Sequence, residues 1–363
     1  MDNPIKPIKF TEQIFDISLH PSNYLIASGL LTGHLFVHQF SNLEATSRIY
    51  RNKLYQKSCR AVSFSTDGKG VYSASKNKTW SFLDLNSQKI SHTETKAHTA
   101  PINKIESLNE QIICTGDDEG CVKLWDIRQK KTAFTFSEHV DYISSFSFNE
   151  NKRHLISTSG DGCMSVYDIR KSKPIAISEN QDDELTCSAV MKNGSKIAIG
   201  SQSGVLGIFS YGMFSDVTDR FPGNPSSIEH MCKISQNCLI TAGGDGYLRV
   251  LNLFPHSYTK VFGQHGSLPL EKIVTTFDKN YLQLLESKRK NAIGLKHGYS
   301  SDPNSDSQPD LILNTKPKFI STNKNKTIEV CESKSDNLDC GQNKIKPANK
   351  KKRKSKNSFF SDL

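Results

Sequence analysis

One tripeptide pattern recurs along this chain at a constant spacing of 42 residues. An apolar residue is followed by an aromatic or aliphatic residue and then by Asp, Ser or Asn. The copies stand at 82–84 (FLD), 124–126 (LWD), 166–168 (VYD), 208–210 (IFS) and 250–252 (VLN). A short alternating segment after a turn leads into each copy, as in GDDEGCVKLWDIR at 116–128. A period of about 40–45 residues with these features is typical of a propeller blade of four strands.

Seven such units fit between about residue 10 and residue 300, so we predict an all-β, seven-bladed β-propeller over residues 1–300. A propeller must close its ring, because an open edge strand invites aggregation. We expect residues 4–10 to be the closing strand of the last blade, paired beyond residues 291–297. That last unit has lost both Trp and Asp from its final motif, so its closure is the weakest part of the pattern.

The period stops at Ser301, and the composition changes with it. The chain has a formal net charge of +10, and residues 301–363 contribute thirteen Lys/Arg against eight Asp/Glu. Few aromatic residues are present there, so we predict a disordered basic tail, which cannot bury enough apolar area to offset its chain entropy. A compact cationic run in this tail indicates nuclear import or phosphate binding. Its members are Lys350, Lys351, Lys352, Arg353 and Lys354.

Several classes of protein are disfavoured by the sequence. The N-terminus has no apolar stretch of signal-peptide length, no run approaches 18 apolar residues, and the nine cysteines are scattered. We therefore expect no membrane span and a reducing compartment. The sequence contains no phosphate-binding loop, no His-Glu-x-x-His zinc motif and no Gly-x-Ser-x-Gly elbow. These observations favour a non-enzymatic protein without cofactor or metal.

A set of polar residues falls where blades of this kind link a loop histidine to a strand hydroxyl and an indole N–H. We expect His98, Thr115 and Trp125 to form such a buried chain, with fragments of it at His139 with Asp161 and at Asp245. The functional alternative, a Ser-His-Asp triad, needs a pocket that nothing in the sequence indicates.

An acidic cluster at 117–119 (DDE) could suggest a metal site. It lacks the spacing of a calcium-binding loop, and we interpret it as a solvated turn.

Two neighbouring units place a cation two residues after the aspartate. Asp126 is followed by Arg128, and Asp168 by Arg170. One interpretation is two surface ion pairs, each worth less than about 1 kcal/mol. The other is a docking pair for a partner protein.

These stretches resemble the WD repeat-containing protein 55 family of WD-repeat propellers. The resemblance rests on AHTAPINKIESLNEQIICTGDDEGCVKLWDIR, SGDGCMSVYDIR, SKNKTWSFLDL, MKNGSKIAIGSQSGVLGIFSYGMFSDVTDRF and the terminal Phe359, Phe360 and Leu363. It covers about residues 15–300 and the last few residues.

The resemblance implies a nucleolar scaffold that supports ribosome biogenesis and ribosomal RNA processing. Its expected partners are pre-ribosomal proteins, with pre-rRNA attracted by the basic tail, and the chain is expected to be monomeric within larger assemblies. The expected location is the nucleus and nucleolus, with the cytoplasm as a second compartment. Arg128 and Arg170 also match the Asp-x-Arg motif by which some WD-repeat proteins dock the adaptor of cullin-RING ubiquitin ligases. A substrate receptor of such a ligase is therefore the alternative function.

Overall fold

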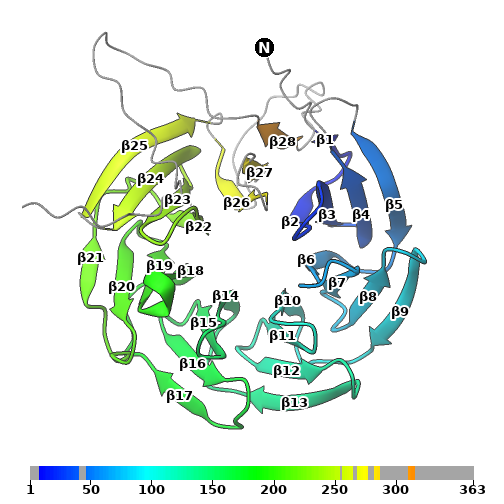
Figure 1. Cartoon of the computed structure of the whole chain (residues 1–363), viewed down its shortest axis with the longest axis horizontal. Coiled ribbons are helices and arrows are strands. Elements are labelled where there is room, and N and C mark those ends of the chain that lie inside the picture. The colour runs from blue at the N-terminus through cyan, green and yellow to red at the C-terminus, as the bar shows by residue number, and fades with distance from the viewer. Residues whose placement is uncertain are drawn as a thin grey trace, which may run out of the picture. The chain divides into compact units, whose positions relative to one another are not determined.

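Seven four-stranded antiparallel sheets make up the described part of the chain (Figure 1). The structure is a computed structural model, and it describes residues 8–40, 46–253, 256–264, 268–276, 282–286 and 310–314. The chain divides into two compact units, Met1–Phe319 and Ile320–Leu363, and every described residue lies in the first. The predicted all-β, seven-bladed architecture is confirmed within these residues.

The first four blades are formed by strands consecutive in sequence. Blade 1 consists of β2 (Ile14–Leu19), β3 (Leu25–Leu30), β4 (His34–Gln39) and β5 (Ser47–Lys53). Blade 2 consists of β6 (Cys59–Phe64), β7 (Gly70–Ser75), β8 (Trp80–Asp84) and β9 (Lys89–Glu94). Blade 3 consists of β10 (Ile102–Ser107), β11 (Ile112–Asp117), β12 (Val122–Asp126) and β13 (Lys131–Phe136). Blade 4 consists of β14 (Ile143–Asn149), β15 (His154–Ser159), β16 (Met164–Asp168) and β17 (Pro174–Ile177).

Blades 5 and 6 continue the same order. Blade 5 consists of β18 (Leu185–Met191), β19 (Lys196–Ser201), β20 (Leu206–Ser210) and β21 (Asp219–Phe221), with the 3-10 turn η1 (Lys192–Gly194) between its first two strands. Blade 6 consists of β22 (Ile228–Lys233), β23 (Cys238–Gly243), β24 (Tyr247–Leu253) and β25 (His256–Gln264). The recurring tripeptides therefore lie in the third strand of each blade, with their last residue at or next to its end.

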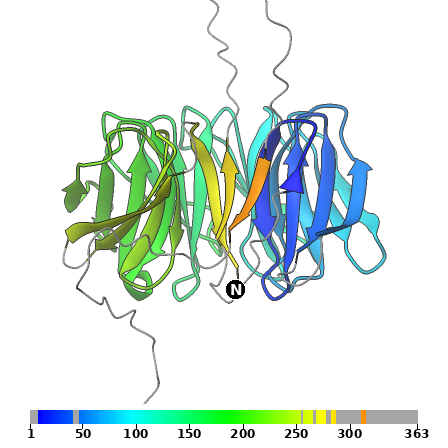
Figure 2. The ribbon, with the colours of Figure 1, turned by 90° about the horizontal axis from the view of Figure 1, so that it is seen from above.

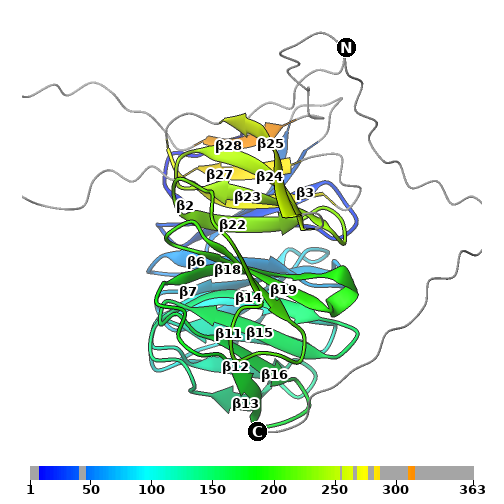
Figure 3. The ribbon, with the colours of Figure 1, turned by 90° about the vertical axis from the view of Figure 1, so that its left-hand side faces the viewer.

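Blade 7 differs from its prediction in one strand. It consists of β26 (Leu270–Thr275), β27 (Leu282–Glu286), β28 (Asp310–Asn314) and β1 (Ile8–Lys9), in the sheet order β1-β28-β27-β26 (Figure 1). Figure 3 shows β28 beside β27. The strand that pairs with β27 thus comes from 310–314, whereas 291–297 lie outside the described residues. The propeller extends past residue 300, so the predicted boundary at 300 is wrong. The alternating segment DLILN at 310–314 forms this strand, although we predicted a disordered tail from residue 301 onwards.

The first strand of each blade lies on the inside of the ring. Neighbouring inner strands contact each other in sequence order, and β2 of blade 1 contacts β26 of blade 7, which closes the ring. β1, close to the N-terminus, forms the outer edge of blade 7 through its pairing with β28. The N-terminal segment therefore occupies the outer position expected for a closing strand, although its neighbour is β28.

Neighbouring blades share their apolar cores, which explains why the strands read as nearly continuous apolar runs. Val122 and Leu124 of blade 3 belong to one buried cluster with Ile143, Leu155 and Tyr167 of blade 4. Each sheet is thus covered on both sides by its neighbours. A blade removed from the ring would expose two apolar faces, so the blades depend on each other for stability.

The ring has two distinct faces, because all strands stand along its axis (Figure 2). One face carries the turns that follow the first and third strands, such as 108–111 and 127–130 in blade 3. It is called the motif face below. The other carries the turns after the second strands, such as 118–121, and the loops with His98 and His139. It is called the histidine face below. No helix in the described part of the chain has the length and apolar character needed to cross a membrane.

Candidate functional site

A buried chain of hydrogen bonds links four side chains of blade 3 on the histidine face. Trp125 Nε1 donates to Thr115 Oγ1 over 2.8 Å, and His98 Nε2 lies 2.6 Å from the same oxygen. His98 Nδ1 lies 2.9 Å from Asp117 Oδ2. Because Thr115 accepts from the indole, its hydroxyl can donate to His98 Nε2, which leaves the Nδ1 proton for Asp117. The chain thus satisfies a neutral histidine at both ring nitrogens.

The protonation states of His98 and Asp117 follow from their burial and their hydrogen bonds. Burial lowers the pKa of His98, and the hydrogen bond to Asp117 opposes this only in part. Burial opposes ionisation of Asp117 as well, but the hydrogen bond from His98 and the backbone N–H of Cys121 hold its pKa below the ordinary value. The structure therefore contains a neutral imidazole beside a carboxylate, both fully covered.

Asp117 corrects the interpretation of the acidic cluster as a solvated turn. Its side chain is fully buried, and Asp118 forms an ion pair with Arg60 at 2.6 Å, so only Glu119 is exposed. Glu119 stands 42 residues before Asp161, the residue that binds histidine in blade 4. In blade 3 this role belongs to Asp117, two positions earlier. The period alone could not identify it, because an acidic residue also occupies the usual position.

The side chains of His98, Asp117 and Cys121 are close enough to be considered as metal ligands. Both nitrogens of His98 are already used by Thr115 and Asp117. Asp117 Oδ1 accepts the backbone N–H groups of Glu119 and Cys121. Burial also raises the pKa of the Cys121 thiol, which disfavours the thiolate that a metal needs. The group is a hydrogen-bonded support of the turn.

Blade 4 has a similar chain with different partners. His139 Nε2 lies 2.8 Å from Ser157 Oγ, and His139 Nδ1 lies 3.0 Å from Asp161 Oδ2. These distances are those of a Ser-His-Asp triad. Ser157 is fully buried, however, so a substrate cannot reach its hydroxyl. Ser157 was not singled out in the sequence, although it lies 42 residues after Thr115.

In blade 6 the predicted residue Asp245 has a cationic partner. Arg249 Nη2 donates to Asp245 Oδ2 over 2.5 Å, and its guanidinium lies 5.3 Å from the centre of the Tyr247 ring. Asp245 thus belongs to an ion pair, and its partner is an arginine of the third strand, whereas a loop histidine is the partner in blades 3 and 4.

The two Asp-x-Arg motifs have the same geometry in blades 3 and 4. Arg128 Nη2 donates to Asp126 Oδ2 over 2.9 Å, and Arg170 donates to Asp168 through Nε at 2.7 Å and Nη2 at 2.8 Å. The two arginine side chains are 60% and 55% exposed. Each guanidinium is therefore oriented by its aspartate while most of its surface faces solvent.

Both aspartates are held in their charged form. The hydrogen bond from Arg128 lowers the pKa of Asp126, and that from Arg170 lowers the pKa of Asp168 to about 2. Asp126 and Asp168 end the third strands of neighbouring blades, so both motifs lie on the motif face. The structure thus brings the two predicted docking residues of each blade together, at corresponding places in the ring.

Hollows between blades open beside both motifs. One of about 210 Å³ between blades 2 and 3 is lined by Trp80, Trp125 and Asp126, and the Trp80 and Trp125 rings lie 5.6 Å apart. Another of about 570 Å³ between blades 3 and 4 is lined by Leu108, Phe148 and Arg170 among others. An oriented arginine beside an apolar recess is a common arrangement for protein recognition. The basic run Lys350 to Lys354 lies outside the described residues.

Comparisons with known proteins point to one family. The family model named WDR55 matches residues 5–290. The chain is 35% identical to the WD repeat-containing protein JIP5 of Coprinopsis cinerea over 272 residues, which cover 72% of this chain and 66% of that relative. It is 33% identical to the WD repeat-containing protein 55 of Arabidopsis thaliana, over 74% of this chain and 76% of the relative. A homologue in Dictyostelium discoideum is 32% identical, over 77% of this chain and 68% of the relative.

Proposed function

The chain belongs to the WDR55 family of WD-repeat proteins, and on this basis we propose that it is a non-enzymatic scaffold in the nucleolus that supports ribosome biogenesis and ribosomal RNA processing. Membership of the family is the observation that carries the proposal. Pre-ribosomal proteins are the proposed partners, and pre-rRNA is attracted by the basic tail.

The architecture suits such a role. Seven blades share their cores and present turns on two faces, so that several partners can bind to one rigid body. The histidines and acids that could suggest catalysis are used to hold turns, and Ser157 is covered. These features favour binding over chemistry.

The proposed nucleolar location depends on the run Lys350 to Lys354. A dense positive charge attracts both import receptors and RNA phosphates, and RNA binding of this kind weakens steeply with salt. Replacing all five residues by Gln should abolish nucleolar accumulation of a fluorescently tagged chain. A matched control deletes residues 303–307, which contain one charge, and should accumulate normally. Unchanged accumulation of the Gln variant would contradict the role of the run.

A second candidate function is a substrate receptor of a cullin-RING ubiquitin ligase. Two oriented, exposed arginines on one face of neighbouring blades favour it. The double variant Arg128→Ala/Arg170→Ala should lose recovery of the ligase adaptor in a pull-down. Removing Arg128 should cost less than about 1 kcal/mol in stability, because its ion pair is largely exposed. Removing Arg170 should cost more, because it takes the cation from Asp168, whose side chain is only 2% exposed. The control Arg48→Ala/Lys89→Ala removes two exposed cations from blades 1 and 2. Equal recovery by both variants would exclude docking through these motifs.

A further inference from the structure

Blade 5 lacks the buried polar chain of blades 3 and 4. Ile199 stands 42 residues after Ser157, where blade 3 has Thr115, and Phe209 stands where blade 3 has Trp125. Neither side chain can form a hydrogen bond, so blade 5 has no series of buried hydrogen bonds like that of blade 3. The interior that a histidine and a hydroxyl occupy elsewhere is left to apolar side chains.

A glycine opens space at the same place. Gly207 of β20 corresponds in the 42-residue period to Lys123 of blade 3, Ser165 of blade 4 and Arg249 of blade 6. In blade 3, the Lys123 side chain reaches over to donate to the carbonyl of Ala97. Gly207 has no side chain of its own, only Val217 Cγ1 lies close to the position of its missing Cβ, at 2.9 Å, and a hollow of about 300 Å³ lies beside it. The hollow is thus a departure from the repeat.

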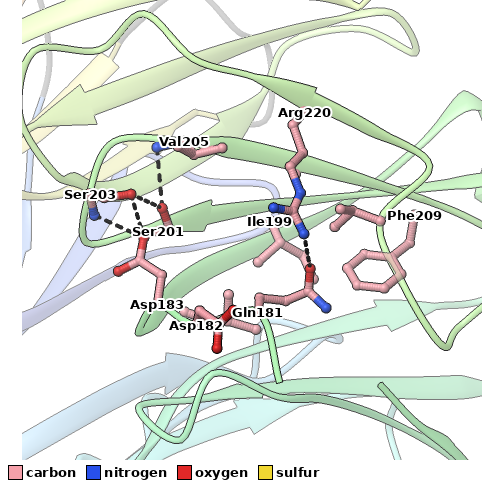
Figure 4. A pocket seen from close by; sticks show the side chains of 12 residues that line it. Gln181, Asp182, Asp183, Ile199, Ser201, Ser203, Val205, Phe209 and Arg220 are labelled. Atoms are coloured by element: carbon pink, nitrogen blue, oxygen red, sulfur yellow. Dashed lines mark hydrogen bonds between the residues drawn. The ribbon is translucent and has the colours of Figure 1, made fainter. Parts of the chain in front are cut away.

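The walls of this hollow are apolar (Figure 4). They are formed by side chains from β18, β19 and β20, from the turn before β20 and from the connection before β21. These are Leu185, Ile199, Val205, Phe209 and Val217. Leu185, Ile199 and Phe209 are buried, and Val205 and Val217 are partly buried. Val217 packs against the same apolar cluster as Ile199 and Phe209. A space of this size and composition suits one bulky apolar side chain.

The mouth of the hollow is polar and held in place by hydrogen bonds. Arg220 Nη2 donates to Gln181 Oε1 over 3.2 Å, and Ser203 Oγ donates to Asp183 Oδ2 over 2.5 Å (Figure 4). Burial opposes ionisation of Asp183, but hydrogen bonds from Ser201 and Ser203 keep its pKa below the ordinary value. Asp183 is therefore charged, and its position is fixed.

The charge around this mouth is opposite to that of the chain. Asp182 and Asp183 line the mouth together with Arg220, which forms an ion pair with Asp216 at 3.6 Å. The two segments that supply these residues, 179–184 (ENQDDE) and 216–220 (DVTDR), contain six carboxylates and one cation, while the whole protein has a net charge of +10. Carboxylates concentrated at a mouth repel phosphate groups and attract lysine and arginine side chains.

We propose that the blade 5 hollow binds a partner peptide in which a bulky apolar side chain is flanked by basic residues. The apolar side chain enters between Ile199 and Phe209, and the basic residues contact Asp182 and Asp183 at the mouth. The acidic rim disfavours a nucleic acid as occupant. The site lies on the histidine face, away from the Asp-x-Arg motifs, and it does not depend on the nucleolar role or on ligase docking.

Fluorescence anisotropy with the purified full chain tests this. The probe is a labelled peptide with a central phenylalanine and two lysines on each side. In one matched peptide, alanine replaces the phenylalanine, and in another, glutamates replace the lysines. We expect the probe to bind, the alanine peptide to bind at least tenfold more weakly because it buries less apolar area, and the glutamate peptide not to bind. Absence of probe binding, or equal binding of the alanine peptide, would overturn the proposal.

Variants locate the binding site. Val217→Trp should fill the hollow and weaken probe binding at least tenfold. Its control is Val140→Trp on the loop before blade 4, because Val140 is 87% exposed and lies outside the hollow. Asp182→Asn changes only an exposed charge at the mouth, so this variant serves if Val217→Trp does not fold. It should weaken binding about threefold at low salt and less at high salt. Binding equal to that of the unaltered chain in both variants would refute a site in blade 5.

Discussion

Blades 3 and 5 have the same strand order, and their first three strands follow the same period, but their interiors are built in opposite ways. Blade 3 joins His98, Thr115, Trp125 and Asp117 by hydrogen bonds that leave no ring nitrogen of His98 unpaired. Blade 5 replaces this chain by apolar side chains and leaves a hollow of about 300 Å³. Both solutions are compatible with the ring, because the shared cores between blades supply most of the burial.

The difference teaches that the polar chain supports the histidine-face turn of its blade and is not required in every blade. A buried polar chain stabilises only when every member has a partner, so losing one member favours losing the others. Once the chain is lost, the turn can be held by other contacts, such as that between Ser203 and Asp183, and the space becomes available for binding.

Removing the histidine should give the largest effect. His98→Ala leaves Asp117 buried without its partner and removes the acceptor of the Thr115 hydroxyl, so we expect a loss of about 3 kcal/mol in unfolding free energy. The comparison is Gln181→Ala, at the corresponding loop position of blade 5, which should cost less than about 1 kcal/mol. Denaturant titration of both variants measures the contrast, and equal losses would break it.

Two substitutions that exchange residue types between the second strands of blades 3 and 5 should each lower the unfolding free energy by an intermediate amount. Thr115→Val keeps the shape but leaves His98 and the Trp125 indole without their shared partner, at a cost of about 2 kcal/mol. Ile199→Thr puts a hydroxyl among apolar side chains and removes a methyl contact, at a cost of about 1–2 kcal/mol. If Ile199→Thr were neutral or stabilising in the same titration, blade 5 would already contain a polar environment.

Two strand glycines provide a smaller contrast. A Cβ at Gly116 of blade 3 would lie 2.7 Å from Ile143 Cβ of blade 4, so Gly116→Ala should cost about 1–3 kcal/mol through overpacking. A Cβ at Gly207 of blade 5 would approach only Val217 Cγ1 closely, at 2.9 Å, and Val217 lines the hollow. Gly207→Ala should therefore change stability by less than about 1 kcal/mol. Thermal unfolding compares the two, and a larger loss for Gly207→Ala would contradict the open hollow.

The smallest effect concerns pH. The folded chain lowers the pKa of His98, so the unfolded chain takes up its proton first as the pH falls. Stability from this group is complete above the ordinary histidine pKa of about 6.5 and is lost as the pH falls through the lower folded value. The melting temperature should therefore fall less between pH 7.5 and about 5.5 in His98→Gln than in Gln181→Ala, which retains the histidine. If the melting temperatures of both variants fell equally over this pH range, His98 would not contribute to the pH dependence of stability.

Most of the fold could be predicted from the sequence, because the 42-residue period gives the position of the third strand of each blade from blade 2 to blade 6. The period fails in blade 7. There β28 pairs with β27 after a separation that no other blade has, and its sequence DLILN lies within a stretch of polar composition. Pairing over such a distance leaves no regular spacing to detect.

The parts of the site that single residues identify could be predicted from the sequence. The part that depends on differences between corresponding positions of several blades was missed. His98, Thr115, Trp125 and the two Asp-x-Arg motifs follow from residue type and position. Asp117 was missed because Glu119 occupies the usual acidic position. The blade 5 hollow was missed because it requires comparing Gly207 with Lys123 and its other equivalents, a signal that the period contains. Its apolar walls come from separate strands, which only the fold brings together.

Hydrogen exchange of the full chain tests most directly whether the polar chain makes blade 3 the more rigid of the two. The relevant amides lie in β11 and β12 for blade 3 and in β19 and β20 for blade 5, where the ladder of backbone hydrogen bonds is the same. We expect the blade 3 amides to exchange at least about tenfold more slowly, and His98→Ala to remove the difference. Equal protection in the unaltered chain, or a difference that survives His98→Ala, would contradict the account.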